Sequence, residues 1–144
     1  MKRFTTLFFV LLLGAASNLV IGQPKLVFDK TDHNFGSFKE SAGPQTATFE
    51  FTNKGTTPLI LNSVNASCGC TTPEWTRQPV APGARGMIKV SYNPANRPGA
   101  FSKSVTVNSN AENPTVMLVI SGKVEEREKT IAELSEQVSE QWKT

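Results

Sequence analysis

Two cysteines and one histidine are the residues of this sequence best suited to chemistry. Cys68 and Cys70 are separated only by Gly69, and His33 is the sole histidine among 144 residues. A pair of sulfurs can form a disulfide, bind a soft metal ion or exchange with other thiols. A structural zinc site needs four ligands, and the chain offers only three soft ones, which argues against intramolecular zinc.

The Cys68–Gly69–Cys70 segment is compatible with four states. In an exported protein we expect a local disulfide that shapes one loop, with Gly69 supplying the backbone freedom to close it. Such a bridge closes a very small ring, so it would constrain the unfolded chain little and would be reduced more easily than a structural bridge. The alternatives are a Cu(I) site formed by Cys68, Cys70 and His33, thiol–disulfide exchange, and two inert thiols.

His33 reaches the cysteines only if its segment and the loop that carries Cys68 and Cys70 lie at the same end of the fold. Its neighbours Asp32 and Asn34 favour a simpler role, namely local hydrogen bonding in a turn. No nucleophile elbow, phosphate-binding glycine loop or paired-metal motif occurs, and no spacing indicates a serine triad. The sequence therefore predicts no catalytic residues and a protein that is not an enzyme.

The N-terminus is typical of an export signal. Lys2 and Arg3 precede an apolar run over residues 7–16, which is too short to span a bilayer. Val20 and Gly22 suit the small-residue positions of a cleavage site, so we expect a signal peptide at 1–22 and cleavage before Gln23. The mature protein is then expected in the periplasm or outside the cell.

The remaining chain shows neither a membrane span nor a nucleic-acid signature. No second apolar stretch approaches the length of a transmembrane helix. The formal charge is only +3, and removal of Lys2 and Arg3 with the signal would lower it further. This weak basic balance does not indicate binding to nucleic acid.

Short alternating segments predict a fold built from strands. In residues 46–52 Ala47, Phe49 and Phe51 share one face, which is the period-two pattern of a half-buried strand. A turn follows at residues 53–55, where Gly55 suits a positive φ. Further strands are expected at 26–28, 34–38, 59–64, around Trp75, and at 87–92, 101–107 and 115–124.

About seven strands without intervening helices predict an all-β fold, an immunoglobulin-like antiparallel β-sandwich over residues 23–124. A parallel sheet would need a crossover helix between its strands, and none is available. The disulfide that links the two sheets of antibody domains is absent, because Cys68 and Cys70 are too close in sequence. Apolar packing must therefore hold the core.

The tail at 125–144 changes character and predicts a short amphipathic helix. Ile131, Leu134, Val138 and Trp142 recur at helical spacing, and Thr130 with Glu133 resembles a capping box. The stripe can dock on its own domain or fray, or it can support self-association or attachment to a partner. Two heptads are too few for a stable coiled coil.

Several motifs occur in a fixed order: DHNFG at 32–36, FTNKG at 51–55 with Pro58 and Leu59, SCGCT at 67–71, PEW at 73–75, and APG at 81–83. With these motifs, nearly all of residues 25–124 resembles exported bacterial proteins of domain-of-unknown-function family 1573. That family resembles the immunoglobulin-like domains of the hydin (ASH) type, which implies a β-sandwich and no particular activity. The resemblance places Cys68 and Cys70 on a recurring Cys-Gly-Cys element and His33 in a His-x-Phe-Gly motif.

These observations lead to two functional hypotheses of different classes. The first is a non-enzymatic exported domain that interacts with a protein of the cell envelope or has a structural role there. The second is a periplasmic accessory protein that uses Cys68 and Cys70 for Cu(I) binding or thiol redox chemistry. The first hypothesis requires no cofactor.

Overall fold

Alternating apolar residues build the central strands. Every second residue of β3 (Gln45–Asn53) and of β6 (Arg85–Tyr92) points inward, and Phe49, Phe51 and Tyr92 are each at most 1% exposed. The residues between them face solvent on the other side of the sheet, as the pleat of a strand requires. The half-buried strands that the alternation predicts are therefore confirmed.

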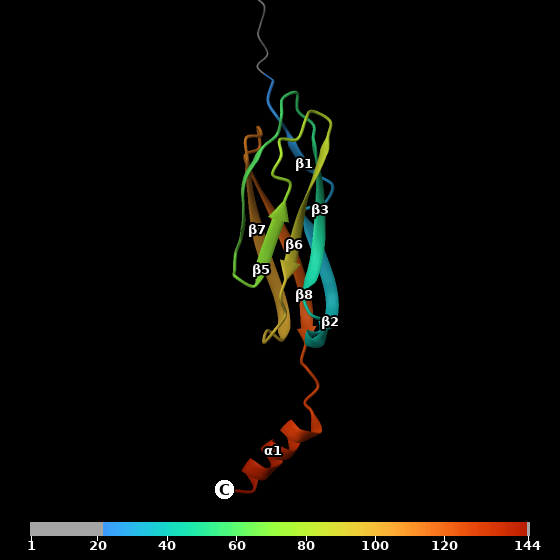
Figure 1. Ribbon diagram of the computed structural model, residues 1–144, viewed down its shortest axis with the longest axis vertical. Coiled ribbons are helices and arrows are strands. Elements are labelled where there is room, and N and C mark those ends of the chain that lie inside the picture. Colours follow the sequence, from blue (N-terminus) through green and yellow to red (C-terminus); the bar gives the residue numbers. More distant parts are fainter. Residues whose placement is uncertain (1–21, 144) are drawn as a thin grey trace, which may run out of the picture.

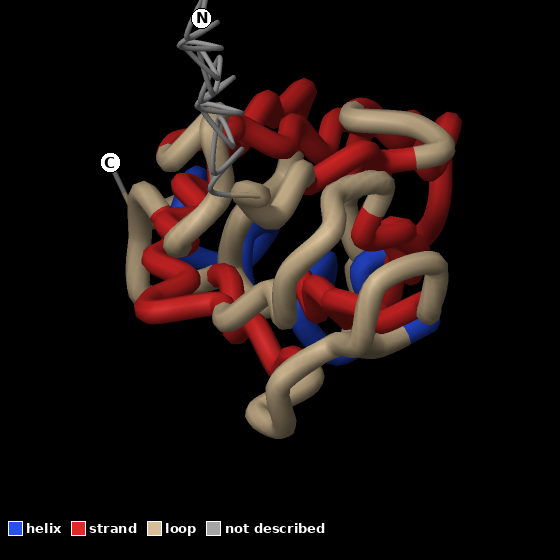
Figure 2. Tube along the Cα trace, turned by 90° about the horizontal axis from the view of Figure 1, so that it is seen from above, coloured by secondary structure: helices blue, strands red, loops and turns tan. Residues whose placement is uncertain are grey.

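The computed structural model describes residues 22–143, in which eight strands form two four-stranded sheets packed face to face (Figures 1 and 2). The strand order is β1-β3-β6-β5 in one sheet and β2-β8-β7-β4 in the other. The strands not yet delimited are β1 (Leu26–Phe28), β2 (Asp32–Lys39), β4 (Leu61–Ala66), β5 (Thr71–Trp75), β7 (Gly99–Ser109) and β8 (Thr115–Glu125). A short 3-10 helix, η1 (Glu40–Ala42), links β2 to β3. The predicted immunoglobulin-like sandwich is confirmed, with eight strands in place of about seven.

One pair of strands departs from the antiparallel arrangement expected from the sequence. β2 runs parallel to β8, and its register shifts at a bulge between Asn34 and Ser37. The chain leaves the first sheet after β1, crosses to the second sheet and continues there as β2. A parallel pair at opposite ends of the sequence needs no crossover helix, because the intervening strands make the connection.

The core lies between the two sheets and is apolar. Its completely buried side chains come from both layers, with Phe49 and Ile88 in one sheet and Val105, Leu118 and Ile120 in the other. Burial of this kind contributes roughly 1.5–3 kcal/mol for each large side chain. Side chains of both sheets therefore contribute to one apolar core.

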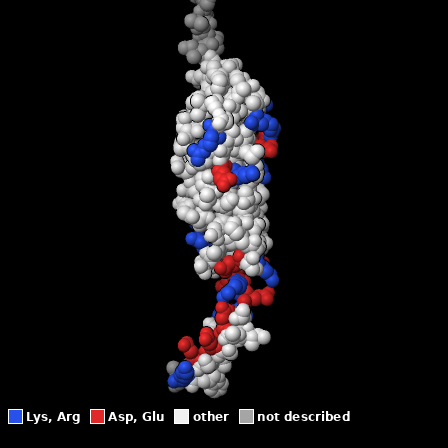
Figure 3. Space-filling view, viewed as in Figure 1, with Lys and Arg blue, Asp and Glu red and all other residues white. Residues whose placement is uncertain are grey.

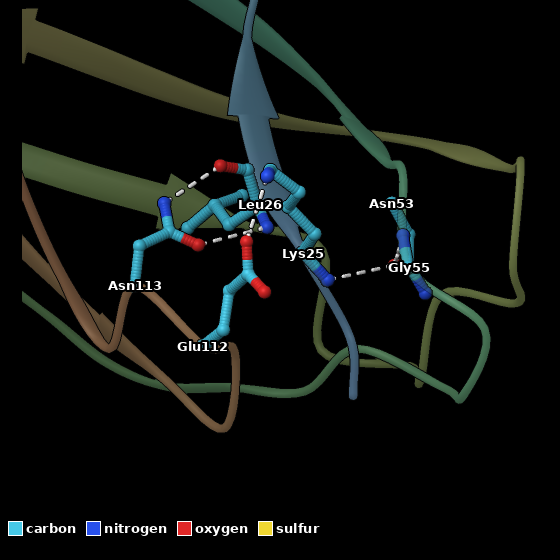
Figure 4. Close-up of polar contacts among 6 residues, drawn as sticks. All are labelled: Lys25, Leu26, Asn53, Gly55, Glu112 and Asn113. Atoms are coloured by element: carbon cyan, nitrogen blue, oxygen red, sulfur yellow. Dashed lines mark hydrogen bonds and ion pairs between the residues drawn. The ribbon is translucent and has the colours of Figure 1, made fainter. Parts of the chain in front are cut away.

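Hydrogen bonds to side-chain amides fasten the first strand to the rest of the sandwich (Figure 4). Asn113 accepts from the backbone N–H of Leu26 and donates to the carbonyl of the same residue. Asn53 accepts from the N–H groups of Lys25 and Gly55. The N-terminal end of the domain is thus held in place by the last residue of β3 and by the loop that follows β7.

Gly55 is required for a different reason from the one expected. Its φ is not positive, but a Cβ at this position would lie 2.2 Å from the carbonyl oxygen of Gln23 and 2.5 Å from the backbone nitrogen of Lys25. The turn therefore needs glycine because the N-terminal segment passes directly over it.

The tail leaves the sandwich at the end opposite to residues 22–25 and carries the helix α1 (Ile131–Gln141) away from it (Figure 1). Thr130 and Glu133 form the predicted capping box. On the face shown in Figure 3, charged atoms gather at this end of the sandwich and along the tail. The helix occupies only part of the predicted tail, because residues 126–130 have no regular secondary structure.

Of the predicted signal peptide, only Gly22 belongs to the described residues. Within residues 22–143, no helix combines the length and the apolar character needed to cross a membrane.

Candidate functional site

The Cys68–Gly69–Cys70 loop connects β4 to β5 and is fastened to two other strands. Ser67 donates its N–H to the carbonyl of Ser104 on β7, and its hydroxyl accepts from the N–H of the same residue. The carbonyl of Cys70 accepts from the N–H of Asn93, directly after β6. Because both sheets supply these anchors, the loop has a defined position at the rim of the sandwich.

Cys68 and Cys70 are joined by a disulfide. Their Cα atoms are 5.3 Å apart, which is within the usual range for bridged cysteines. A backbone hydrogen bond from Thr71 to the Cys68 carbonyl tightens the loop. Gly69 is not required sterically here, since its φ is not positive and a Cβ would meet nothing within 4 Å.

The two cysteines differ in exposure. Cys70 belongs to the core and is 6% exposed, whereas Cys68 is only partly buried. The hydroxyl oxygen of Thr71 lies 3.6 Å from the Cys68 sulfur and 3.8 Å from the Cys70 sulfur. Reagents from solvent therefore have access to Cys68, and Thr71 provides a hydrogen-bonding group beside both sulfurs.

The bridge borders a hollow of about 460 Å³ at the rim. Tyr92 and Phe101 also line it, and their rings are stacked with centroids 3.8 Å apart. Arg97 and Lys103 supply positive charge, and no carboxylate belongs to the lining. The hollow therefore combines a disulfide, an aromatic surface and two cations.

The aromatic residues of the hollow are partly withdrawn from water. Burial raises the pKa of the Tyr92 hydroxyl, and the positive charge of nearby Arg97 acts in the opposite direction. Tyr92 therefore stays protonated and neutral at physiological pH, and Arg97 and Lys103 determine the charge of the hollow.

His33 lies away from the cysteines. It is on β2, at one edge of its sheet, whereas Cys68 follows β4 at the other edge, with β8 and β7 between them. At the usual strand spacing this separation is roughly 14 Å. The Nδ1 atom of His33 is 3.2 Å from the amine of Lys30, and its ring packs edge-on against Phe35.

The Cu(I) site that the sequence suggested is thus not assembled in this structure. The sulfurs of Cys68 and Cys70 are bonded to each other, so neither is a thiolate ligand, and His33 is too far away to complete the set. Within residues 22–143, no three His, Cys, Asp or Glu side chains come together in an arrangement that could hold a metal.

Sequence reasoning missed the cations and the aromatic surface of the hollow. Arg97 lies between the strands expected at 87–92 and 101–107, and Tyr92 and Phe101 were expected simply as residues of those strands. The available signal was the proline- and glycine-rich turn from Asn93 to Gly99, which had to connect two strands that are consecutive in the sequence. The strand register that brings this turn beside Cys68 is a tertiary property.

The apolar stripe of α1 forms a second candidate surface. Ile131 and Trp142 are 86% and 84% exposed, and Leu134 and Val138 are about half exposed. No residue of the helix is buried. Of the alternatives open for the tail, docking of this stripe on its own sandwich does not occur in this structure.

The sandwich matches a known protein family. Residues 26–124 match the family described as "Protein of unknown function (DUF1573)". The chain belongs to this family. The match begins at β1 and ends in β8, so it covers the whole sandwich and leaves α1 outside.

Solved structures share the fold at low sequence identity. A protein of unknown function from Porphyromonas gingivalis W83 has a TM-score of 0.62 and 18% identity over 69% of this chain and 46% of its own chain. The Vibrio cholerae protease VesB has a TM-score of 0.55 and 14% identity over 70% of this chain and 32% of its own. The YadV chaperone has a TM-score of 0.52 and 13% identity over 76% of this chain and 56% of its own. This chain therefore corresponds to roughly half or less of each, and the likeness shows the sandwich alone. No curated protein matches the sequence.

Proposed function

We propose that this DUF1573 member is an exported, non-enzymatic domain that binds another protein of the cell envelope through its C-terminal helix. In this proposal the sandwich holds the helix at a distance from the N-terminal end of the domain. The observation that carries the proposal is the solvent-exposed apolar stripe of α1, a helix that lies outside the sandwich.

A helix as short as α1 depends on packing for its stability. An isolated helix of 11 residues is marginal in water, even with a good N-terminal cap. Ile131, Leu134, Val138 and Trp142 are then exposed in a helix that gains no stability from tertiary packing. A partner surface that buries these four side chains would stabilise the helix and remove apolar area from water.

The charge of the tail narrows the class of partner. The polar face of α1 carries Glu133, Glu136 and Glu140, and residues 125–130 carry three more glutamates against two cations, Arg127 and Lys129, so the tail has an excess of negative charge. Anionic lipid surfaces repel such a helix, whereas a protein groove with basic rims attracts it. We therefore favour a protein partner over the membrane surface.

Photo-crosslinking in cells that export the protein tests this proposal. A photoreactive side chain at Leu134 is expected to give a discrete adduct of higher mass in the envelope fraction. The same group at Glu140, on the opposite face of the helix, is expected to give much less. An adduct of twice the chain mass would identify a second copy as the partner, which is the self-association considered above.

Two outcomes would contradict the proposal. Equal labelling from Leu134 and Glu140 would mean that the stripe makes no specific contact. Recovery of the chain in the cytoplasm with residues 1–22 still attached would mean that it is not exported. An intact mass equal to that of a chain beginning at Gln23 would support cleavage at the expected site.

A further inference from the structure

The disulfide at the rim presents two sulfurs of unequal accessibility. Thiol–disulfide exchange requires a thiolate to approach one sulfur of a bridge and displace the other. Both cysteines line the hollow, but Cys70 is only 6% exposed and its carbonyl is held by Asn93, whereas Cys68 is partly exposed. An incoming thiolate can therefore reach the Cys68 sulfur and would release Cys70.

The charge of the hollow favours an anionic reagent. Arg97 and Lys103 line it together with the bridge, and neither forms an ion pair with a carboxylate within residues 22–143. The attacking species is a thiolate, whose negative charge these cations attract. Carboxylate groups elsewhere on a small thiol would increase this attraction.

The position of the loop favours re-formation of the Cys68–Cys70 bridge after a thiolate has opened it. Thr71 is 4% exposed, and its hydroxyl lies 3.8 Å from the Cys70 sulfur, where it can donate to a released thiolate. The anchors at Ser104 and Asn93 keep Cys70 beside Cys68 when the bridge opens. Cys70 can then attack a mixed disulfide on Cys68 and close the bridge again.

We propose that the Cys68–Cys70 bridge is a thiol–disulfide exchange site that reacts at Cys68 with small thiols carrying carboxylates. The first thiolate forms a sulfur–sulfur bond to Cys68, and the electron pair of the broken bridge leaves on Cys70. A second thiolate attacks the thiol-derived sulfur of the mixed disulfide and releases Cys68. Two thiols are oxidised to one disulfide, the bridge is reduced by two electrons, and the protons lost by the thiols pass to Cys68 and Cys70.

The preference for anionic thiols is tested with two reductants on the native chain. Reduced glutathione carries a net negative charge, whereas 2-mercaptoethanol is neutral. The double variant Arg97→Gln, Lys103→Gln is expected to slow reduction of the bridge by glutathione about three- to tenfold at low salt. The rate of reduction by 2-mercaptoethanol should change by less than about twofold. Added salt should reduce the difference. Lys123→Gln, on β8 and outside the lining of the hollow, is the matched control.

The assignment of the attacked sulfur is tested with single cysteine variants and glutathione disulfide. Cys70→Ser leaves the accessible Cys68 thiol and is expected to form a stable mixed disulfide, visible as a mass increase. Cys68→Ser leaves the buried Cys70 thiol, which is expected to react at least about tenfold more slowly.

Equal rates for the two single variants, with melting temperatures that show both to be folded, would overturn the assignment of Cys68. Equal slowing of both reductants by the double variant would overturn the preference for anionic thiols. A bridge that is reduced only in denaturant would overturn the exchange site itself.

Discussion

Asn53 is a buried polar residue whose side chain makes hydrogen bonds to four backbone groups of the chain. It is 0% exposed, and its amide group makes hydrogen bonds of 2.8–3.2 Å. Its oxygen accepts from Lys25 and Gly55, and its nitrogen donates to the carbonyls of Thr57 and Val80. A shorter side chain cannot satisfy these backbone groups away from water.

We therefore expect Asn53→Ala to lower the free energy of unfolding by about 3 kcal/mol. Urea denaturation of the two proteins measures the change. Asn62→Ala, at an exposed position of β4, is the control and should change stability by less than about 0.5 kcal/mol. If the two variants unfold at the same urea concentration, Asn53 does not have the role described here.

His33 should give the domain a pH-dependent stability near neutrality. Burial and, to a lesser extent, Lys30 lower the pKa of His33 below its ordinary value of 6.5, against the opposing effect of Asp32. The unfolded chain therefore binds the proton more tightly than the folded one. The contribution to stability is complete above the ordinary pKa and is lost as pH falls through the lowered pKa of the folded state.

The matching experiment compares melting temperatures of the native chain and His33→Gln between about pH 7.5 and pH 5. The native chain should lose more stability on acidification than the variant, because only its imidazole titrates in this range. Parallel curves would mean that His33 has the same pKa in both states.

At the scale of elements, the sequence predicted the strands better than their pairing. The alternation in residues 46–52 and 87–92 directly reflects which side chains meet the core, and so it located β3 and β6. The parallel pairing of β2 with β8 leaves no such trace, because either direction buries the same side chains. Capping is local, and for this reason Thr130 and Glu133 were predicted correctly.

The candidate site shows the same division between local and tertiary information. The spacing of Cys68 and Cys70 allowed a bridge to be considered from the sequence alone. The separation of His33 from Cys68 by β8 and β7 depends on the order of strands in the sheet. The arrival of Arg97 and Lys103 beside the bridge depends on register, which no motif records.

The N-terminal cap of α1 determines how much of this helix forms in the free protein. Thr130 accepts from the N–H of Glu133, and the Glu133 carboxylate accepts from the N–H of Thr130. We expect Thr130→Ala to destabilise the helix by about 1 kcal/mol, enough to unfold much of so short a segment.

Backbone chemical shifts of residues 131–141 report this helix content. Ser139→Ala is the control, because it removes one side-chain hydrogen bond within α1 and introduces a better helix former. Its shifts should stay helical. Helical shifts in Thr130→Ala as well would mean that something other than the cap stabilises α1.

At the scale of the whole molecule, the sandwich and the tail are two parts with separate roles. The core lies entirely between the two sheets, and α1 buries none of its own residues. An exposed ion pair between Lys39 and Glu128 connects the tail to β2, and such pairs contribute little to stability. The domain should therefore fold without its helix, and the helix should be free for a partner.

Removal of residues 127–144 tests this central claim most directly. Thermal unfolding of the mature chain and of the truncated chain should give melting temperatures within about 3 °C of each other, because no core contact is lost. A fall of about 10 °C or more would show that the tail completes the sandwich, and it would contradict both the autonomy of the domain and the free helix.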